Sequence, residues 1–307
     1  MGRYVIRRLL QMIPVFFGAT LLIFLMVNVM GDPIAGLCGE RQCDPATAAR
    51  LRSEFGLDKP VWQQYATYMG NVFTGDFGTA FNGQKVTELM GTAFPVTIRL
   101  TVVAIVFEIV IGISLGVVTG LQRGRPVDTG VLILTLVVIS IPTFVTGLLL
   151  QLLLGVEWGV IKPSVSPQAP FNELLVPGLV LASVSLAYVT RLTRTSIAEN
   201  ARADYVRTAV AKGLPRRRVV IRHLLRNSLI PVVTFIGTDV GALMGGAIVT
   251  ERIFNIHGVG YQLYQGILRQ NSQTVVGFVT ILVLVFLAAN LIVDLLYAVL
   301  DPRIRYA

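Results

Sequence analysis

The sequence predicts an all-α integral membrane protein with six transmembrane helices. Of its 307 residues, 54% are hydrophobic and 14% are charged, and the mean hydropathy is +0.70. Soluble domains carry about 25% charged residues, so this chain is too apolar for an ordinary soluble globular domain. The third observation is a series of long apolar stretches, each able to cross about 30 Å of hydrocarbon.

Five apolar stretches are uninterrupted, and a sixth is weaker. The weaker one covers residues 174–190 and contains Pro177 and several serines. It can still span if neighbouring helices cover its backbone polar groups. The five clear candidates are residues 9–30, 98–121, 131–154, 229–249 and 275–300.

The first stretch follows three arginines, as the apolar core of a signal peptide would. It is longer than such a core, however, and no small-residue cleavage site follows it. We therefore expect a retained helix.

The distribution of positive charge predicts the orientation. Six spans place both termini on one side, and cytoplasmic loops carry an excess of Lys and Arg. With a cytoplasmic N-terminus, the inside segments hold 17 of the 26 Lys and Arg residues, ten of them in residues 191–228. The net charge of +9 is therefore a topology signal and does not indicate nucleic-acid binding.

The chain reads as one transmembrane domain, residues 1–307, without a linker or an internal repeat. Its parts are an N-terminal helix (1–30), a large extracytoplasmic segment (31–97) and a five-helix core (98–300). The outer segment predicts two short amphipathic surface helices. The first begins after Asp44 with Pro45 as its first helical residue. The second presents Trp62, Tyr65, Met69 and Val72 at helical spacing.

Several common sites are missing from the sequence. It contains no phosphate-binding loop of the G-x-x-x-x-G-K-[ST] type and no G-x-S-x-G nucleophile elbow. The two histidines, His223 and His257, fall on opposite predicted sides, so a histidine metal site is not expected. Cys38 and Cys43 lie in the outer segment, where they could form a disulfide or stay reduced.

Three carboxylates lie within the predicted spans. Each costs about 2.5–3.5 kcal/mol at a helix centre, so it should face the bundle interior or an aqueous cavity. Glu108 and Asp239 either line a translocation pathway, where they would meet a cationic group of the cargo, or form helix–helix hydrogen bonds. Asp294 is a third pathway candidate. It shares a helix face with Asn290 and Tyr297, which favours a structural clasp near the inner interface.

Small residues cluster in the fifth span. Two overlapping G-x-x-x-G steps predict close helix packing, and a glycine backbone that lines a passage is the alternative. Both can hold at once. The residues are Gly237, Gly241, Gly245 and Gly246.

The basic segment 204–227 predicts a helix, a sharp turn and a second helix at the cytoplasmic surface. Asp204 is the expected N-cap, Gly213 the left-handed cap position, and Pro215 suits the first turn of the next helix. Three arginines at residues 216–218 oppose the dipole of that helix, so their charge needs another purpose. Anionic lipid headgroups, a docked protein and a DNA-binding helix-turn-helix are the alternatives; the short flanks disfavour the last.

The same segment resembles the cytoplasmic loop of ATP-binding-cassette (ABC) importer permeases, in their dipeptide and oligopeptide branch. That family has the pattern E-A-A, three residues, then Gly; here "RTA" at 207–209 and Gly213 match it in register. "HLLR" at 223–226 replaces the I-x-L-P of the general family. Both substitutions are typical of the peptide branch.

The resemblance extends over nearly the whole chain. "MGDP" at 30–33, "SIPTF" around Pro142, "TERIFNIHGVG" at 250–260 and "DPRIR" at 301–305 match the branch. His257 stands where the branch often has Pro, and "RQNSQT" at 269–274 lacks its usual R-D-x-P.

This resemblance implies a type I permease fold in the cytoplasmic membrane of a prokaryote. It implies a homologous second permease, two ABC ATPase subunits and an extracytoplasmic peptide-binding protein as partners, and no nucleic acid. ATP and Mg would be bound by the ATPase subunits and no cofactor by this chain, which would not itself be an enzyme. The ATPase-coupling residues would be Arg207, Thr208, Ala209, Lys212, Gly213, Leu214 and Pro215.

The implied cargo is a dipeptide or oligopeptide. Glu108 or Asp239 could meet its amine, and Arg99 or helix N-termini its carboxylate. A nickel or glutathione importer is the alternative within the family. A stand-alone channel or an intramembrane enzyme is the alternative outside it.

Overall fold

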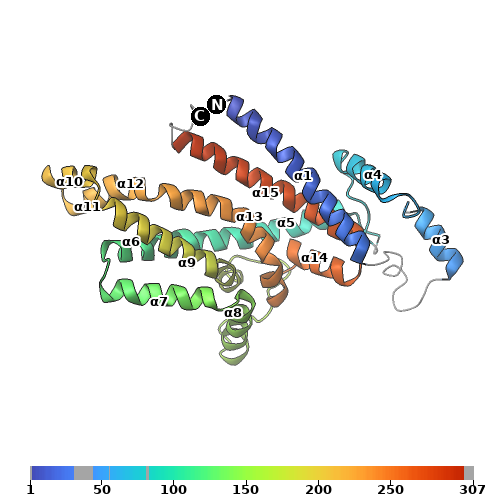
Figure 1. The fold of residues 1–307 in the computed structure, drawn as a ribbon. Coiled ribbons are helices and arrows are strands. Elements are labelled where there is room, and N and C mark those ends of the chain that lie inside the picture. Colours follow the sequence, from blue (N-terminus) through green and yellow to red (C-terminus); the bar gives the residue numbers. More distant parts are fainter. Residues whose placement is uncertain (1, 31–43, 55, 81–82, 301–307) are drawn as a thin grey trace.

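The computed structural model describes residues 2–30, 44–54, 56–80 and 83–300 (Figure 1). Over these ranges the chain is almost entirely helical, and the only strand-like pairing is an isolated antiparallel bridge between Thr79 and Lys85. This confirms the all-α prediction. Five helices are long and apolar enough to span a membrane, or six if one bent pair counts as a span.

The spans lie close to their predicted positions. The weak sixth candidate is part of a 26-residue helix, α9, which is therefore a clear span. The second candidate belongs to a span that begins earlier, at Val86, and is continuous to Leu121 through a π-helical turn. The spans are α1 (Gly2–Met30), α5 (Val86–Phe107) with η1 (Glu108–Gly112) and α6 (Ile113–Leu121), α9 (Leu175–Asn200), α13 (Ile230–Ile253) and α15 (Ser272–Leu300).

The expected span over residues 131–154 is broken in its middle and is not one continuous helix. The chain bends by 97° between α7 (Pro126–Ser140) and α8 (Thr143–Leu150), which continues into the π-helix η2 (Gln151–Glu157). Pro142 is the cause, because it lacks a backbone N–H and forces the preceding residue out of the helical region. Ile141 accordingly has φ −92° and ψ 123°.

Glycines let α6 approach α9 closely. Gly112, Gly116 and Gly120 recur every four residues, and a Cβ atom at each would overlap a side chain of α9. The partners on α9 are Val189, Thr193 and Ile197. This contact is the membrane version of small-residue helix packing.

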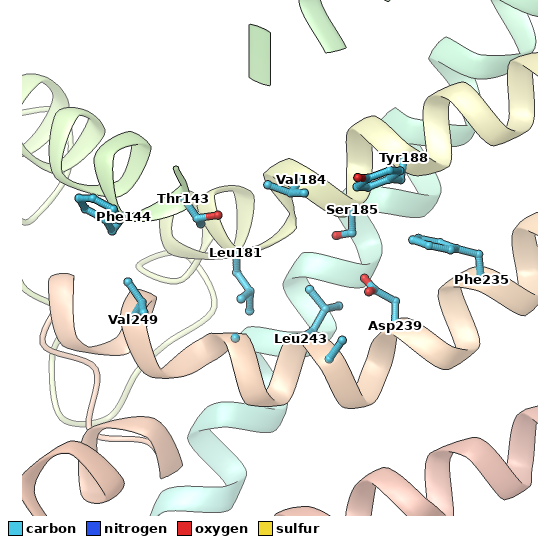
Figure 2. A pocket seen from close by; sticks show the side chains of 12 residues that line it. Thr143, Phe144, Leu181, Val184, Ser185, Tyr188, Phe235, Asp239, Leu243 and Val249 are labelled. Atoms are coloured by element: carbon cyan, nitrogen blue, oxygen red, sulfur yellow. The ribbon is translucent and has the colours of Figure 1, made fainter. Parts of the chain in front are cut away.

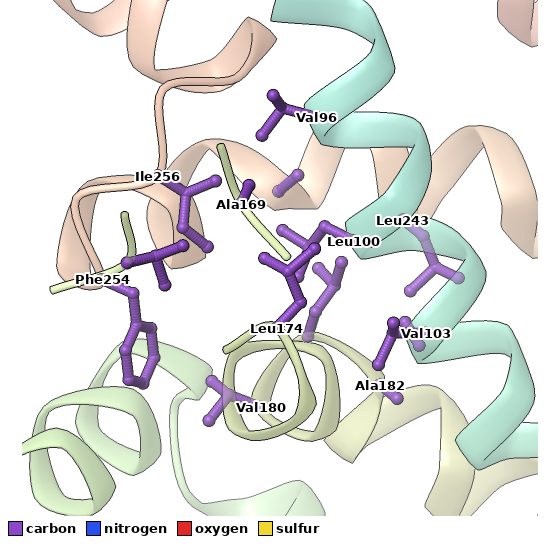
Figure 3. Close-up of a cluster of buried hydrophobic side chains, with 14 residues drawn as sticks. Val96, Leu100, Val103, Ala169, Leu174, Val180, Ala182, Leu243, Phe254 and Ile256 are labelled. Atoms are coloured by element: carbon purple, nitrogen blue, oxygen red, sulfur yellow. The ribbon is translucent and has the colours of Figure 1, made fainter. Parts of the chain in front are cut away.

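A buried apolar cluster lies between α5, α9, α13 and the segments that adjoin them (Figure 3). Leu100 from α5, Leu174 before α9 and Phe254 after α13 are each 0% exposed. They join three segments that are far apart in the sequence. The cluster therefore fixes α5 against α9 and α13.

The two predicted surface helices exist. They are α3 (Pro45–Glu54) and α4 (Val61–Phe73), and Pro45 is the first helical residue as expected. In α4, Met69 and Val72 are buried, whereas Trp62 is 68% exposed. Together with α14 (Val259–Leu268), which the sequence analysis did not predict, they lie at one end of the bundle (Figure 1).

Two tyrosine side chains of α4 contact the spans α1 and α15 through their hydroxyl groups. The Tyr65 hydroxyl lies 2.9 Å from the Thr20 hydroxyl of α1, and the Tyr68 hydroxyl lies 2.7 Å from that of Thr280 on α15. Burial raises the pKa of Tyr68 to about 12, so this phenol stays neutral.

The opposite end holds the α6–α7 turn and the basic segment (Figure 1). There the Asp128 carboxylate, 2% exposed, accepts two hydrogen bonds from Arg194, of 2.6 and 2.7 Å. It accepts a third from the backbone N–H of Gly124. This pair ties the start of α7 to α9.

Candidate functional site

A cavity of about 560 Å³ opens between α8, α9 and α13 (Figure 2). Its wall is mostly apolar, and its polar side chains are Thr143, Ser185, Tyr188 and Asp239. No basic residue lines it. A largely apolar pocket with a few convergent polar groups is the usual form of a small-ligand site.

Asp239 and Ser185 face each other across this cavity. Figure 2 shows the Asp239 carboxyl group directed toward Ser185 on the neighbouring helix. Phe235, one helical turn before Asp239, pairs with the ring of Tyr188, with ring centroids 6.3 Å apart. The acid therefore sits beside aromatic surface.

Glu108 stands behind this wall. Its side chain is 0% exposed, and its Oε1 atom accepts a hydrogen bond of 2.5 Å from Ser185 Oγ. Its Oε2 atom and Asp239 Oδ2 are both buried and lack a hydrogen bond of normal geometry among the described residues. The two carboxyl groups are close enough to interact with each other.

The π-helical turn η1 begins at Glu108. Its wider turn replaces the ordinary backbone pattern at the depth where the carboxyl group enters the bundle. Such π-bulges occur frequently at functional sites. The sequence analysis expected Glu108 and Asp239 to face the interior or a cavity, and it did not expect them to meet through Ser185.

The third carboxylate lies elsewhere. Asp294 on α15 forms an ion pair of 3.1 Å with Arg8 on α1 and does not line the cavity. The proposed clasp partner Asn290 donates instead to the backbone carbonyl of Phe286, and the side chain of Tyr297 lies outside the description. The contact with Arg8 fits the clasp interpretation, whereas a role of Asp294 in the pathway has no support in its position.

Both interpretations of the glycine cluster apply, to different residues. Gly237 and Gly241 pack against Val293 and Phe286 of α15, where a Cβ atom would overlap the partner side chain. Gly246 lines the cavity, and Gly245 meets nothing within 4 Å. Arg99 does not reach the cavity, because it donates to the backbone carbonyl of Gln168.

The basic segment forms the predicted helix–turn–helix. Its first helix is α10 (Asp204–Ala211), and Gly213 has φ +74°, the left-handed conformation expected at the cap. Pro215 then precedes the second helix, which consists of α11 (Arg216–Arg218), the π-helix η3 (Val219–Leu224) and α12 (Leu225–Ser228).

Two details of this prediction are wrong. Ala203, not Asp204, is the N-cap of α10, and no side chain caps this end. The spacing of a regular helix predicts one face shared by Val219, Val220, His223, Leu224 and Asn227. This face is also altered, because the π-helix changes the spacing: Val219 and Leu224 are buried, while Asn227 is exposed.

One face of α10 packs inward and the other is open. Val206 and Ala209 are buried against Ile197, the last part of α9, in one apolar cluster. Of the predicted coupling residues, Ala209 is thus buried and Leu214 is partly buried. The other five are exposed: Arg207, Thr208, Lys212, Gly213 and Pro215.

The sequence analysis missed a buried site at the other end of α13. Glu251 is 0% exposed, and it accepts hydrogen bonds from Thr97 Oγ1 at 2.5 Å and from the backbone N–H of Tyr261 at 3.0 Å. A side chain at Gly258 would overlap Glu251 and Thr97. The motif "TERIFNIHGVG" holds this acid and this glycine, but it was used only as a family signature.

Some predicted features fall outside the described residues. They are Cys38 and Cys43, most of "MGDP", and "DPRIR". Among the residues that the structure describes, no group of three or more His, Cys, Asp or Glu side chains could hold a metal ion.

Comparison with known families assigns the chain throughout its length. Residues 108–306 match the family model "Binding-protein-dependent transport system inner membrane component". Residues 1–104 match the corresponding N-terminal family, "Binding-prot-dependent transport system membrane comp, N-term".

Individual relatives agree with this assignment. The dipeptide transport system permease protein DppB of Escherichia coli K12 is 38% identical over 337 residues, covering 100% of this chain and 99% of the relative. The di/tripeptide transport system permease protein DppB of Pseudomonas aeruginosa UCBPP-PA14 is 37% identical, with coverages of 99% and 98%. The glutathione transport system permease protein GsiC of E. coli K12 is 35% identical, with both chains covered completely. The chain therefore belongs to the inner membrane components of binding-protein-dependent transport systems, as an ABC importer permease of the DppB-like branch.

Proposed function

We propose that this permease imports dipeptides and short oligopeptides across the cytoplasmic membrane. The observation that carries the proposal is the similarity along the full chain to permeases named for dipeptide and di/tripeptide transport. The cavity between α8, α9 and α13 supports it, because its volume and mixed apolar and acidic wall suit a short peptide.

Glutathione is the second candidate cargo. Its support is the GsiC relative, which is 35% identical and equally complete in coverage. Nickel remains a further alternative within the family; no cluster of metal ligands exists among the described residues, although a metal could travel as a complex.

The proposed assembly contains this chain, a homologous second permease, two ABC ATPase subunits and an extracytoplasmic binding protein. ATP and Mg would reside on the ATPase subunits. The N- and C-termini and the basic segment would face the cytoplasm, in agreement with the excess of Lys and Arg there. The helices α3, α4 and α14 would then face outward.

The basic segment would be the coupling element. Exposed residues of α10 would contact one ATPase, while Val206 and Ala209 fix α10 against the inner end of α9. Because this contact is packed and apolar, a movement of α10 would be passed to α9, which carries Ser185 at the cavity. Coupling of this kind requires an element with two states, and the two permease halves are the proposed element.

Cargo is tested by uptake competition. Proteoliposomes that contain the assembled complex would receive a labelled dipeptide, the binding protein and internal ATP. Unlabelled di-, tri- and tetrapeptides, glutathione and a nickel salt would compete. Competition by peptides alone is expected; competition by glutathione or nickel alone would assign the alternative cargo.

Docking is tested by cross-linking. Single cysteines at Arg207 and Lys212, in a background without the two native cysteines, should capture an ATPase subunit in intact cells. Thr67→Cys on α4 is the control, because it is exposed at the opposite end of the bundle. Capture from Thr67 but not from Arg207 would reverse the proposed orientation.

A further inference from the structure

One side of the cavity wall is acidic, and its charge determines which end of a peptide the wall would attract. Among the residues that the structure describes, Asp239 is the one carboxyl group that lines the cavity, and no Lys, Arg or His side chain lies in the lining to neutralise it. The surrounding wall is apolar, so water cannot replace a missing partner completely. A buried carboxylate without a partner is costly, and a cationic ligand group would relieve that cost.

The arrangement of the lining residues also favours one kind of cationic ligand group. Ser185 and Asp239 offer oxygen atoms from two different helices, and the ring of Tyr188 stands on the same side. A primary ammonium group has three donors and a compact charge, so it can bind a carboxylate, a hydroxyl and an aromatic face together. An anion in the same place would meet only the repulsion of Asp239.

A second carboxyl group, that of Glu108, lies behind the cavity wall. It is completely buried, its Oε1 atom accepts a hydrogen bond from the Ser185 hydroxyl, and its other oxygen has no hydrogen bond among the described residues. The one hydroxyl proton of Ser185 is directed to Glu108 and to the backbone carbonyl of Ala182, so its oxygen can only accept a hydrogen bond from a ligand. Glu108 is therefore a positioning residue that orients Ser185 as an acceptor beside Asp239.

We infer that Asp239 and Ser185, backed by Glu108, bind the free N-terminal ammonium group of the transported peptide. This assignment rests on the proposed peptide function and deepens it. It predicts that the permease itself, and not only an external binding protein, discriminates between peptides with a free and a blocked N-terminus.

The test places a photo-cross-linker in the cavity wall. Val184 lines the cavity on α9 and is partly exposed, so p-benzoylphenylalanine at this position can report an occupant. The assembled complex, without the binding protein, would be irradiated with increasing concentrations of labelled dialanine or of its N-acetylated form. Import of dialanine by the same complex with binding protein and ATP is measured in parallel.

The expected result is saturable capture of dialanine, with N-acetyl-dialanine bound about tenfold or more weakly. Asp239→Asn should weaken dialanine by a similar factor and leave the acetylated peptide unchanged. Asp239→Glu should restore part of the difference. Thr238→Val, which alters a polar residue next to Asp239 on α13 that is exposed and does not line the cavity, is the matched control and should change neither peptide.

Three results would overturn the inference while the peptide function stands. They are import without saturable capture, equal capture of both peptides, and capture of the second permease chain in place of peptide. If the complex imports no dialanine at all, the proposed function fails instead. The parallel import measurement separates these two failures.

Discussion

Ser185 on α9 donates a 2.5 Å hydrogen bond to Glu108 on η1, and it does so from the rim of the cavity that Asp239 lines. Ser185 thus lies between the buried acid of η1 and the cavity acid of α13. Neither acid has a basic partner there. The arrangement explains how two carboxyl groups are kept at membrane depth, because each lies away from lipid and the deeper one is held by a donor.

Loss of the Ser185 hydroxyl should destabilise the bundle modestly. In Ser185→Ala, Glu108 loses its hydrogen-bond donor, and hydrogen bonds between membrane helices contribute about 0.6–1.7 kcal/mol. We expect a lower midpoint of thermal unfolding in detergent for the purified protein. Ser183→Ala is the control, because Ser183 bonds only to the carbonyl of Val180 in its own helix. Equal midpoints for both variants would contradict a role for the interhelical bond.

The turn at Gly213 offers a sharper test of coupling. Its φ of +74° disfavours any residue with a Cβ, yet nothing lies within 4 Å of the position where that Cβ would be. Gly213→Val therefore adds backbone strain of about 1 kcal/mol or more without a steric clash. We expect normal insertion, retained ATP hydrolysis and strongly reduced peptide uptake. Gly213→Asn, which tolerates this conformation, should keep most uptake.

A second glycine serves as a matched control for strain. Gly124, in the α6–α7 turn, has φ +81° and equally open surroundings. Gly124→Val should cost similar stability and leave the ratio of uptake to ATP hydrolysis near that of the unaltered protein. If both variants lower the ratio of uptake to ATP hydrolysis by the same factor, backbone strain alone explains the loss, and the basic segment has no special role in coupling.

The fold was largely predictable because long apolar stretches and Lys/Arg asymmetry are strong signals. The bend after α7 was missed because Pro142 lies within an apolar run, and hydropathy does not register a change of direction. Residues 174–190 looked weak because of their serines, but Ser185 and its neighbours face the bundle, where polar groups find partners. The π-helical turns were not foreseeable, since they depend on tertiary contacts.

Individual residues of the site were predictable from the sequence, but their arrangement was not. Glu108 and Asp239 stood out as charges at membrane depth, whereas their meeting through Ser185 depends on the rotation of three helices. Glu251 was overlooked because it lies at the end of a span, where a charge is unremarkable by hydropathy. The adjacent Gly258 was a usable signal: a glycine shortly after an acid marks a close backbone approach.

The Glu251 site should be essential for the end of the bundle where α14 lies. Thr97 donates to Glu251 Oε1 and accepts a 2.8 Å hydrogen bond from the backbone N–H of Val259, so it joins α5 to α13 and α14. Thr97→Val leaves two buried groups unsatisfied, at about 1–3 kcal/mol each. We expect a clear loss of stability in a thermal unfolding assay. Thr101→Val, whose hydroxyl bonds only within α5, should be much milder.

Two ion pairs, Arg194–Asp128 and Lys162–Glu173, should respond differently to removal of the cation. Asp128 is 2% exposed, so Arg194→Ala leaves a buried unpaired carboxylate, and we expect a loss of about 3–5 kcal/mol. In Lys162–Glu173 the lysine side chain is 66% exposed, so Lys162→Met should cost much less than Arg194→Ala. Both are measured by chemical unfolding in detergent. A larger loss for Lys162→Met than for Arg194→Ala would refute this ranking.

The loop before α9 should open only in strong acid. Lys162, with the backbone N–H and hydroxyl of Ser166, donates to Glu173 and lowers the pKa of this carboxyl group to about 2. A carboxyl group whose pKa is lowered in the folded state stabilises that state above its unfolded pKa, which is 4.5 for Glu173. This contribution declines as the pH falls below about 4.5, and it is lost as the pH passes through about 2.

Hydrogen exchange of the Ser166 amide should therefore remain slow at about pH 4, relative to an unstructured peptide, and approach the unprotected rate near pH 2. Glu173→Gln removes the charge at every pH, so its Ser166 amide should exchange faster already at neutral pH and show no further loss of protection between pH 4 and 2. A step in protection near the ordinary carboxyl pKa would show instead that these donors do not hold Glu173 in its charged form.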